Sequence, residues 1–369
     1  MKKFLLVTLA LFFTITAQEE KKDIHQFKMI NEVKTTSVKD QGSTGTCWAF
    51  AATSYFETEL LRMGKGEYDL SEMFVVRNAY PLKAEKYIRR HGTSNFSQGG
   101  QAHDVLMIYK NNGIVPEEIY AGNPIEGRHN HSELEYVMKG MLDGVLAGRK
   151  LTDKWDDALS STLDAYLGDI PEEFSFNGNN YSPKSFFDEL GINPDDYIEF
   201  TSYNNRNYYD WIELEIPDNW TNDKYFNIPM NDILEIMDNA LSNGYSICWD
   251  GDSGKDHFYR NEGYAVIPVD DENKLEDRTE PEKEKEITED LRIEAFNSFD
   301  VTDDHLMHIV GTAENQNGTK FYYTKNSWGT KDKKYDGYWY MSEAYVKLKT
   351  VAIMVHKNAV PKSILGKMK

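Results

Sequence analysis

One cysteine in this sequence has the neighbours that a nucleophile needs. Cys47 opens a segment, residues 47–63, whose apolar residues recur every three or four positions and predict a helix. The helix dipole and the unpaired N–H groups of the first turn favour a negative charge, so Cys47 is placed to form a thiolate. The alternative is a small cysteine that is simply buried at a helix start.

The residues before Cys47 favour the catalytic interpretation over burial alone. Gly42 and Gly45 allow the backbone to turn tightly into the helix. Gln41 can then return over the nucleophile and donate an N–H to an oxyanion. One such donor is typically worth about 3 kcal/mol in the transition state of acyl transfer.

A cysteine nucleophile also needs a base and a group that orients the base. The chain has nine histidines, so residue type alone does not choose among them. His129 and His131 could suggest a metal site, but no third ligand accompanies them and a surface loop is the preferred explanation. We therefore expect neither a metal nor any other cofactor.

The segment Gln-Gly-Ser-Thr-Gly-Thr-Cys-Trp-Ala-Phe, residues 41–50, resembles the nucleophile segment of the papain superfamily. The spacing from Gln41 to Cys47 matches that family. The family usually has a cysteine where Thr44 stands, and that cysteine forms a disulfide. Its absence here removes a covalent link and leaves the catalytic groups in place.

Two later segments resemble the family's base and its orienting residue. Residues 303–311 are similar to its Asp-His strand, and this register selects His305 as the base. His308 is the runner-up, but on a strand it faces the opposite side, and a packing role is preferred. The motif Asn-Ser-Trp-Gly implies that Asn326 orients the imidazole and that Trp328 shields their hydrogen bond from water.

Several further segments are similar to the bleomycin hydrolase and aminopeptidase C branch of the family, over about residues 34 to 361. His305 lies much farther from Cys47 along the chain than in papain itself, which implies a large insertion. In the loop 97–101, Gly99 and Gly100 would let the substrate backbone approach and are expected to bind it. Cys248 falls where that branch often has a strand cysteine, and we expect it to be structural.

Helical patterns early in the chain and strand patterns late in it indicate an α+β protein. The resemblance specifies a papain-like fold of two lobes, one helical and one resembling an antiparallel β-barrel, with a large and mainly helical insertion. The expected divisions are a signal peptide, a polar lead-in, a helical lobe with the nucleophile helix, the insertion, and a β-rich lobe with the histidine and asparagine: residues 1–17, 18–36, 37–125, 126–230 and 231–369.

The N-terminus predicts export. Lys2 and Lys3 precede an apolar run, and Ala17 stands before a charged stretch, which is typical of a secretory signal cleaved after Ala17. A buried N-terminal helix is the alternative. We expect a periplasmic or secreted enzyme, and no other stretch approaches the ~18 apolar residues that a membrane span needs.

The net charge of −20 argues against a nucleic-acid partner, because phosphate contacts need Lys and Arg. The most acidic stretch, residues 270–290, is predicted to be a solvated loop. The expected partners are peptide substrates and, as an open possibility, further copies of the chain, without a membrane.

The expected function is hydrolysis of peptide bonds by a resting thiolate–imidazolium pair of Cys47 and His305, oriented by Asn326, with Gln41 in the oxyanion hole. The resemblance favours an aminopeptidase, whose C-terminal arm usually binds the substrate's amino terminus through its carboxylate. Here the final stretch, residues 360–369, is basic and short, so an endopeptidase is an alternative. The second alternative is a catalytically silent homologue that binds peptides.

Overall fold

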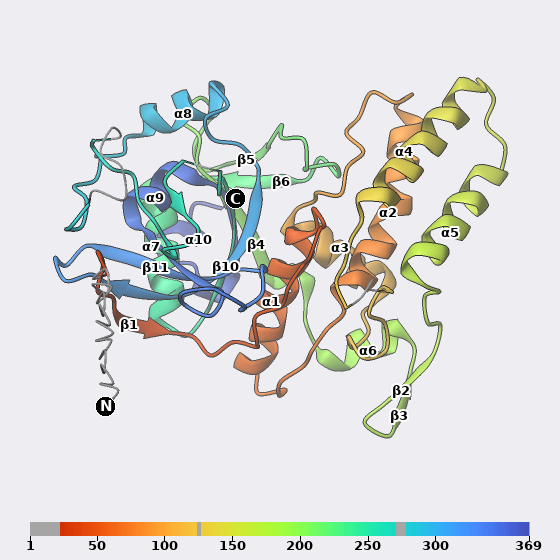
Figure 1. Ribbon diagram of the computed structural model, residues 1–369, viewed down its shortest axis with the longest axis horizontal. Coiled ribbons are helices and arrows are strands. Elements are labelled where there is room, and N and C mark those ends of the chain that lie inside the picture. Colours follow the sequence, from red (N-terminus) through yellow and green to blue (C-terminus); the bar gives the residue numbers. More distant parts are fainter. Residues whose placement is uncertain (1–22, 124–126, 255, 271–277, 369) are drawn as a thin grey trace, which may run out of the picture.

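The protein consists of a helical lobe and a sheet-rich lobe with one long helix between them (Figure 1). The structure, a computed structural model, describes residues 23–123, 127–254, 256–270 and 278–368. The predicted signal peptide lies outside the described residues. Helices and a large sheet are both present, so the expected α+β class is confirmed.

The helical lobe packs its helices around the nucleophile helix, with a small hairpin at its lower end in Figure 1. Its elements are α1 (Cys47–Arg62), α2 (Glu72–Arg89), α3 (Ala102–Asn112), α4 (Ser132–Ala147), α5 (Lys154–Leu167), β2 (Phe174–Phe176), β3 (Asn179–Tyr181), α6 (Pro183–Leu190) and the short helix η1 (Pro194–Asp196).

Helix α1 is the central element because it is buried on every side. All of its residues from Cys47 to Leu60 are buried, and Gly64, at a φ of 72°, ends it in the left-handed conformation that glycine accepts readily. The helical lobe's core also takes in Leu306, Cys248 and Met354 from the sheet. Packing against both lobes therefore fixes the position of the predicted nucleophile.

The other lobe is built on a large, mostly antiparallel sheet of 11 strands. In spatial order its strands are β5 (Asp210–Glu213), β6 (Lys224–Asn227), β4 (Tyr197–Thr201), β13 (Thr350–His356), β7 (Ile247–Gly251), β10 (His305–Glu314), β11 (Lys320–Lys325), β12 (Tyr338–Ser342), β9 (Tyr264–Ala265) and β8 (Phe258–Tyr259), and β1 (Lys28–Glu32) pairs with β10. The accompanying helices are α7 (Met230–Ser242), α8 (Glu289–Asn297), α9 (Glu343–Lys349), η3 (Lys357–Ala359) and α10 (Lys362–Leu365).

Strand β10 separates the two cores of the molecule. Leu306 belongs to the core shared with α1, whereas Met307 and Ile309 belong to the core inside the sheet-rich lobe. This alternation follows from the two-residue period of a strand. It places His305 and His308 on opposite faces, as the sequence predicted.

The sheet recruits more of the chain than the sequence indicated. Strands β4 to β6 lie within the segment expected to be an insertion, and β1 lies within the polar lead-in, yet all of them join the sheet. Central strand β13 was not predicted, because a short, uniformly apolar run does not distinguish strand from helix. Helix α2 also had no predicted counterpart, and Pro81 stands inside it, where proline is normally disfavoured.

The acidic stretch 270–290 is not simply a solvated loop, so that expectation was partly wrong. Its described part folds back on the sheet: the N–H of Val269 donates to the carbonyl of Lys283 at 2.8 Å. Glu284 accepts from the N–H of Ile267 at 3.0 Å and also from Ser342. Arg278 is 7% exposed. Specific hydrogen bonds therefore hold charged residues that composition alone assigns to solvent.

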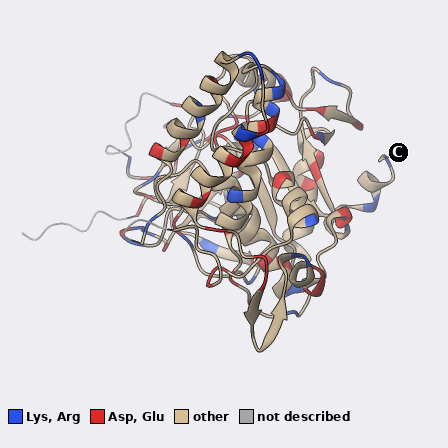
Figure 2. Ribbon diagram, turned by 90° about the vertical axis from the view of Figure 1, so that its right-hand side faces the viewer, with Lys and Arg blue, Asp and Glu red and all other residues tan. Residues whose placement is uncertain are grey.

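The surface of the helical lobe carries both signs of charge. In the side view of Figure 2, Lys and Arg are interspersed with Asp and Glu over the helices. Within the part of the chain that the structure describes, no helix is both long enough and apolar enough to cross a bilayer. The last described residues pack on the sheet-rich lobe, where Ile364 is buried and Lys367 donates to Tyr209 at 2.8 Å.

Candidate active site

Cys47 is the first residue of α1 and is 9% exposed. The side chain of Thr46 caps none of the N–H groups in the first turn, and its carbonyl accepts from Ala49 at 3.0 Å, so the N–H groups of Cys47 and Trp48 are left without a partner within the helix. Thr44, which replaces the family's usual cysteine, donates to the carbonyl of Gln41 at 2.8 Å and pairs with Thr46 at 2.6 Å. Hydrogen bonds thus shape the turn without a disulfide, and both cysteines are free.

The thiol of Cys47 is held in its neutral form in this arrangement. Burial, with smaller contributions from the carboxylates of Asp218, Asp303 and Asp250, raises its pKa to about 12, against a lowering backbone hydrogen bond with Leu306. These influences oppose the expected resting thiolate. The helix terminus alone does not offset burial beside acidic groups.

A neighbour from the other lobe fixes the orientation of Gln41. The hydroxyl of Ser327 donates to Oε1 of Gln41 at 2.6 Å, and the backbone N–H of Gln41 donates to the carbonyl of Ser327 at 2.8 Å. Nε2 donates to the carbonyl of Thr44 at 2.8 Å. Because an amide nitrogen carries two hydrogens, the second remains to donate beside Cys47.

His305 and Asn326 meet as the resemblance implied. Nε2 of His305 lies 2.8 Å from Oδ1 of Asn326, and both residues are buried. Trp328 stacks on the imidazole, with ring centroids 4.8 Å apart. The guanidinium of Arg260 lies over the ring of Trp328, 4.6 Å from its centroid. Trp328 therefore covers the histidine, as expected.

Burial is also the main influence on the base. It lowers the pKa of His305, against the raising effects of the Asn326 hydrogen bond and of Asp304. Among the described residues no hydrogen bond joins Cys47 and His305. Burial thus favours the uncharged form of each group, the thiol of Cys47 and the imidazole of His305.

The glycine loop packs against the start of α1. Nε1 of Trp48 donates to the carbonyl of Gln98 at 2.9 Å, and Oε1 of Gln98 accepts from the N–H of Gly45 at 2.7 Å. A β-carbon on Gly100 would lie 2.9 Å from the indole of Trp48. A side chain on Gly99 would collide with the carboxylate of Asp218. The two glycines are thus needed for close packing, and Asp218 already lies against one of them.

His308 and Cys248 lie outside the catalytic group. Nδ1 of His308 is 2.9 Å from Oγ of Ser54, and burial lowers the pKa of this histidine well below its usual value. Cys248 is 1% exposed in the core of the helical lobe. These surroundings agree with the structural roles expected for both residues.

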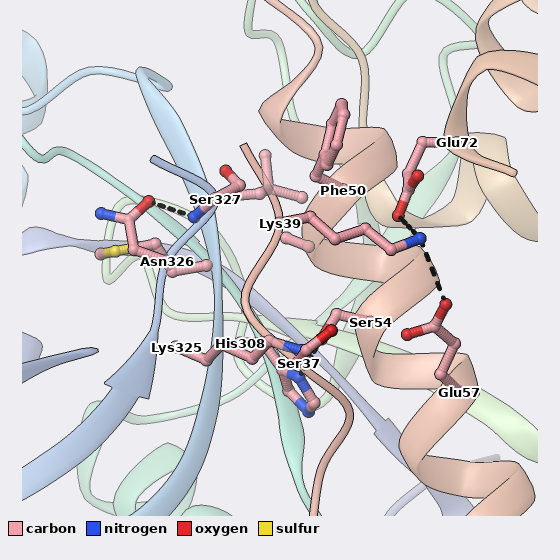
Figure 3. A pocket seen from close by; sticks show the side chains of 13 residues that line it. Ser37, Lys39, Phe50, Ser54, Glu57, Glu72, His308, Lys325, Asn326 and Ser327 are labelled. Atoms are coloured by element: carbon pink, nitrogen blue, oxygen red, sulfur yellow. Dashed lines mark hydrogen bonds and ion pairs between the residues drawn. The ribbon is translucent and has the colours of Figure 1, made fainter. Parts of the chain in front are cut away.

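A buried polar cluster lies behind Asn326, between the two lobes (Figure 3). Its lysines come from both sides: Lys325 donates to Ser54 at 2.8 Å, and Lys39 pairs with Glu72 at 2.8 Å and Glu57 at 3.5 Å. The enclosed cavity is about 10 Å³, enough for one water at most. Because Lys325 directly precedes Asn326, this cluster anchors the strand end that presents the asparagine.

No metal centre is formed by His, Cys, Asp and Glu within the described residues. His131 instead faces Tyr80 at 3.3 Å, and burial lowers its pKa to about 4. The sequence argument missed three groups beside Cys47. Ser327 could have been inferred from its place between Asn326 and Trp328, whereas Asp218 and Asp250 come from segments without a recognisable motif.

Comparison with known proteins places this arrangement in a family. The model of the peptidase C1-like family matches residues 81–369. The chain belongs to the peptidase C1-like family. That match begins after Cys47 and Gln41, so it does not itself test these two residues.

Curated relatives extend the similarity over most of the chain. Aminopeptidase C of Listeria monocytogenes is 23% identical, over 91% of this chain and 83% of the relative. Aminopeptidase C of Listeria innocua is 20% identical with the same coverage. This peptidase C1-like protein is therefore a papain-like cysteine peptidase.

The fold is shared with a solved structure. The crystal structure of PepW from Lactobacillus rhamnosis HN001 superimposes with a TM-score of 0.76 at 19% identity, over 92% of this chain and 84% of that one. This likeness confirms the expected papain-like fold of the peptidase.

Proposed function

We propose that this cysteine peptidase hydrolyses peptide bonds with Cys47 as nucleophile, His305 as base and Asn326 as the residue that orients the base. The hydrogen bond between His305 and Asn326 carries the proposal. Oδ1 of an amide only accepts, so Nε2 of His305 holds the hydrogen and Nδ1 is left to take a proton from Cys47. The backbone N–H of Ser327 also donates to that oxygen, at 2.7 Å, which supports this orientation of the amide.

The reaction starts from the neutral pair. As the sulfur of Cys47 attacks the substrate carbonyl, Nδ1 of His305 accepts the thiol proton and the carbonyl oxygen becomes an oxyanion. Nε2 of Gln41 and the backbone N–H of Cys47 stabilise that oxyanion. His305 returns the proton to the leaving amine as the C–N bond breaks, and water then hydrolyses the thioester with the same histidine as base.

We further propose that the enzyme acts as an aminopeptidase, as the names of the Listeria relatives indicate for those proteins. An endopeptidase is the second candidate, based on the short basic C-terminal stretch. Paired assays of the same peptide with a free and an acetylated amino terminus decide between them, because an aminopeptidase cleaves the first and spares the second.

The catalytic assignment is tested by comparing the two cysteines. Cys47→Ala should abolish turnover, whereas Cys248→Ala, which removes the same atom from a site in the core, should keep most of it. Iodoacetamide should label the native protein at Cys47 only. Full activity in Cys47→Ala would overturn the mechanism, and an unreactive Cys47 in a folded protein would indicate the silent peptide-binding homologue.

A further inference from the structure

The connection between β5 and β6 reaches from the sheet-rich lobe to the helical lobe beside the glycine loop. Nδ2 of Asn95 donates to the carbonyl of Pro217 at 3.2 Å and to Oδ1 of Asp218 at 3.1 Å. Nζ of Lys86, on α2, contacts the carbonyl of Trp220, whose ring is buried in the helical lobe's core. The connection is therefore held by both lobes at this end of the site.

Asp218 stands directly on the backbone of Gly99. A β-carbon placed on Gly99 would lie 2.6 Å from one carboxylate oxygen and closer still to the other. Oγ of Ser97 donates to Asp218 at 3.3 Å, which adds to the Asn95 contact and fixes the carboxylate over the loop. A peptide whose backbone lies along Gly99 and Gly100 would have one of its ends next to the carboxylate of Asp218.

Two further carboxyl groups lie behind Asp218. The carboxylate of Asp303 accepts a backbone hydrogen bond from Asp218 and one from Nε2 of Gln101, the latter at 2.9 Å. Asp250 is 3% exposed, and no donor among the described residues reaches either of its oxygens. Its carboxyl can pair with Asp303 only by keeping a proton of its own. Apart from that proton shared with Asp303, no donor among the described residues satisfies this buried carboxyl.

The charge around these groups is predominantly negative. Lys83 is the base packed against them, and its Nζ already contacts the carbonyl of Gly99. Asp104, Glu135 and Glu199 add further acids nearby, and His103 lies 3.6 Å from Asp104 and 2.6 Å from Glu199. Burying carboxylates in this number is costly unless a cation or protons compensate. Because the described residues form no metal-ligand set, an organic cation is the better match.

We propose that Asp218, with Asp303 and Asp250 behind it, binds an ammonium group of the peptide substrate, and that this group is the free amino terminus. The proposal rests on the proposed peptidase function and deepens it. An ammonium carries three donors in a compact shape, which suits converging carboxylates. The loop that carries Gly99 packs on the start of α1, through hydrogen bonds of Gln98 with Gly45 and Trp48, so the site lies beside the nucleophile. That favours the α-amino group over a more distant side chain.

A binding comparison tests the site without turnover. In Cys47→Ala, a fluorescein-labelled pentaalanine with a free amino terminus should bind about 10- to 100-fold more tightly than the acetylated peptide. Equal affinities would overturn the proposal. This measurement leaves Asp218 unchanged, so it does not depend on how a variant at that position folds.

Turnover then identifies the residue and the source of the ammonium. The substrates are alanine methylcoumarylamide, its N-acetyl form, and N-acetyl-lysyl-alanine methylcoumarylamide. Asp218→Asn should lower kcat/KM for the free-amine substrate by about 30-fold, mainly through KM, and change the acetylated one little. Asp223→Asn, which removes an exposed charge from the same connection, should change neither. Preference for the acetyl-lysyl substrate would overturn the assignment to the amino terminus.

The two proposals fail in different ways. If the binding difference persists in Cys47→Ala but the wild-type protein cleaves none of the substrates, the ammonium site stands and the peptidase mechanism falls. If the wild-type protein cleaves free and acetylated substrates equally well, the mechanism stands and the ammonium site falls.

Discussion

Nε2 of His305 lies 2.8 Å from Oδ1 of Asn326, although the two residues stand at opposite ends of a β-hairpin. His305 begins β10 and Asn326 follows β11, and the antiparallel pairing of these strands brings the two ends together. The hairpin register therefore sets the orientation of the base. A change of register by one residue would turn one side chain to the other face.

Loss of the orienting amide should slow the chemical step. Asn326→Ala leaves Nε2 of His305 without its acceptor, so the imidazole loses its fixed tautomer and orientation. We expect kcat to fall about 100-fold with little change in KM. Steady-state kinetics would measure this, with Asn204→Ala, an exposed asparagine, as the control. An unchanged kcat would remove Asn326 from the mechanism.

Removal of the covering indole should shift the pH profile. Burial lowers the pKa of His305, and Trp328 stacks on its ring, so Trp328→Leu should admit water and raise that pKa toward the ordinary value. Because the neutral imidazole is the base, the acid limb of kcat/KM should move to higher pH. Trp211→Leu, at an exposed position, should leave the limb in place.

The neutral resting thiol predicts how Cys47 reacts with alkylating agents. With its pKa raised to about 12 by burial and nearby acids, the thiolate fraction should grow by about 10-fold per pH unit. The rate of labelling by iodoacetamide in Cys248→Ala should therefore rise continuously between about pH 6 and pH 9. A rate that is constant over this range would instead show the resting thiolate–imidazolium pair.

The preference for a free amino terminus should increase with pH near neutrality. Burial and the charge of Asp218 raise the pKa of Asp303 to about 7, so its carboxylate forms only as the pH passes through that value. The ratio of kcat/KM for free and acetylated alanine amides cancels the titration of Cys47 and His305. We expect this ratio to rise from about pH 6 to about pH 7.5 and to flatten in Asp303→Asn. A fall caused by the substrate's own ammonium, with a pKa of about 8, comes above this range. A ratio independent of pH in the wild-type protein would contradict this.

A carboxyl in the acidic stretch should make stability depend on pH. Burial raises the pKa of Glu284 from 4.5 to about 7, so the unfolded chain releases this proton first as the pH rises. The group's contribution to stability is thus present below about pH 4.5 and lost toward pH 7. Glu284→Gln, which keeps both acceptor contacts, should remove about 1–2 kcal/mol of that decline in urea titrations at pH 5 and pH 7. An equal loss of unfolding free energy between pH 5 and pH 7 in the two proteins would contradict the assignment.

Local patterns explain which elements could be predicted. The helical spacing of α1 and the apolar and aromatic runs of β10 and β11 can each be recognised within one segment, and the structure has all three. Strand β13 and the sheet membership of β4 were missed because both depend on neighbours that come from distant segments. Sheet pairing is a long-range interaction, so residue types within one segment do not specify it.

The sequence by itself determined the candidate catalytic residues, because Cys47, His305 and Asn326 stand in segments that resemble those of the papain superfamily. Only the tertiary structure decided their electrostatic state. The folding of the two lobes buries Cys47 beside Asp218, Asp303 and Asp250, and desolvation together with these charges outweighs the helix dipole that the sequence alone suggested. The pKa of the thiol is consequently raised, and the acidic side chain of Asp218 lies against Gly99, where the sequence indicated only a loop lining the cleft.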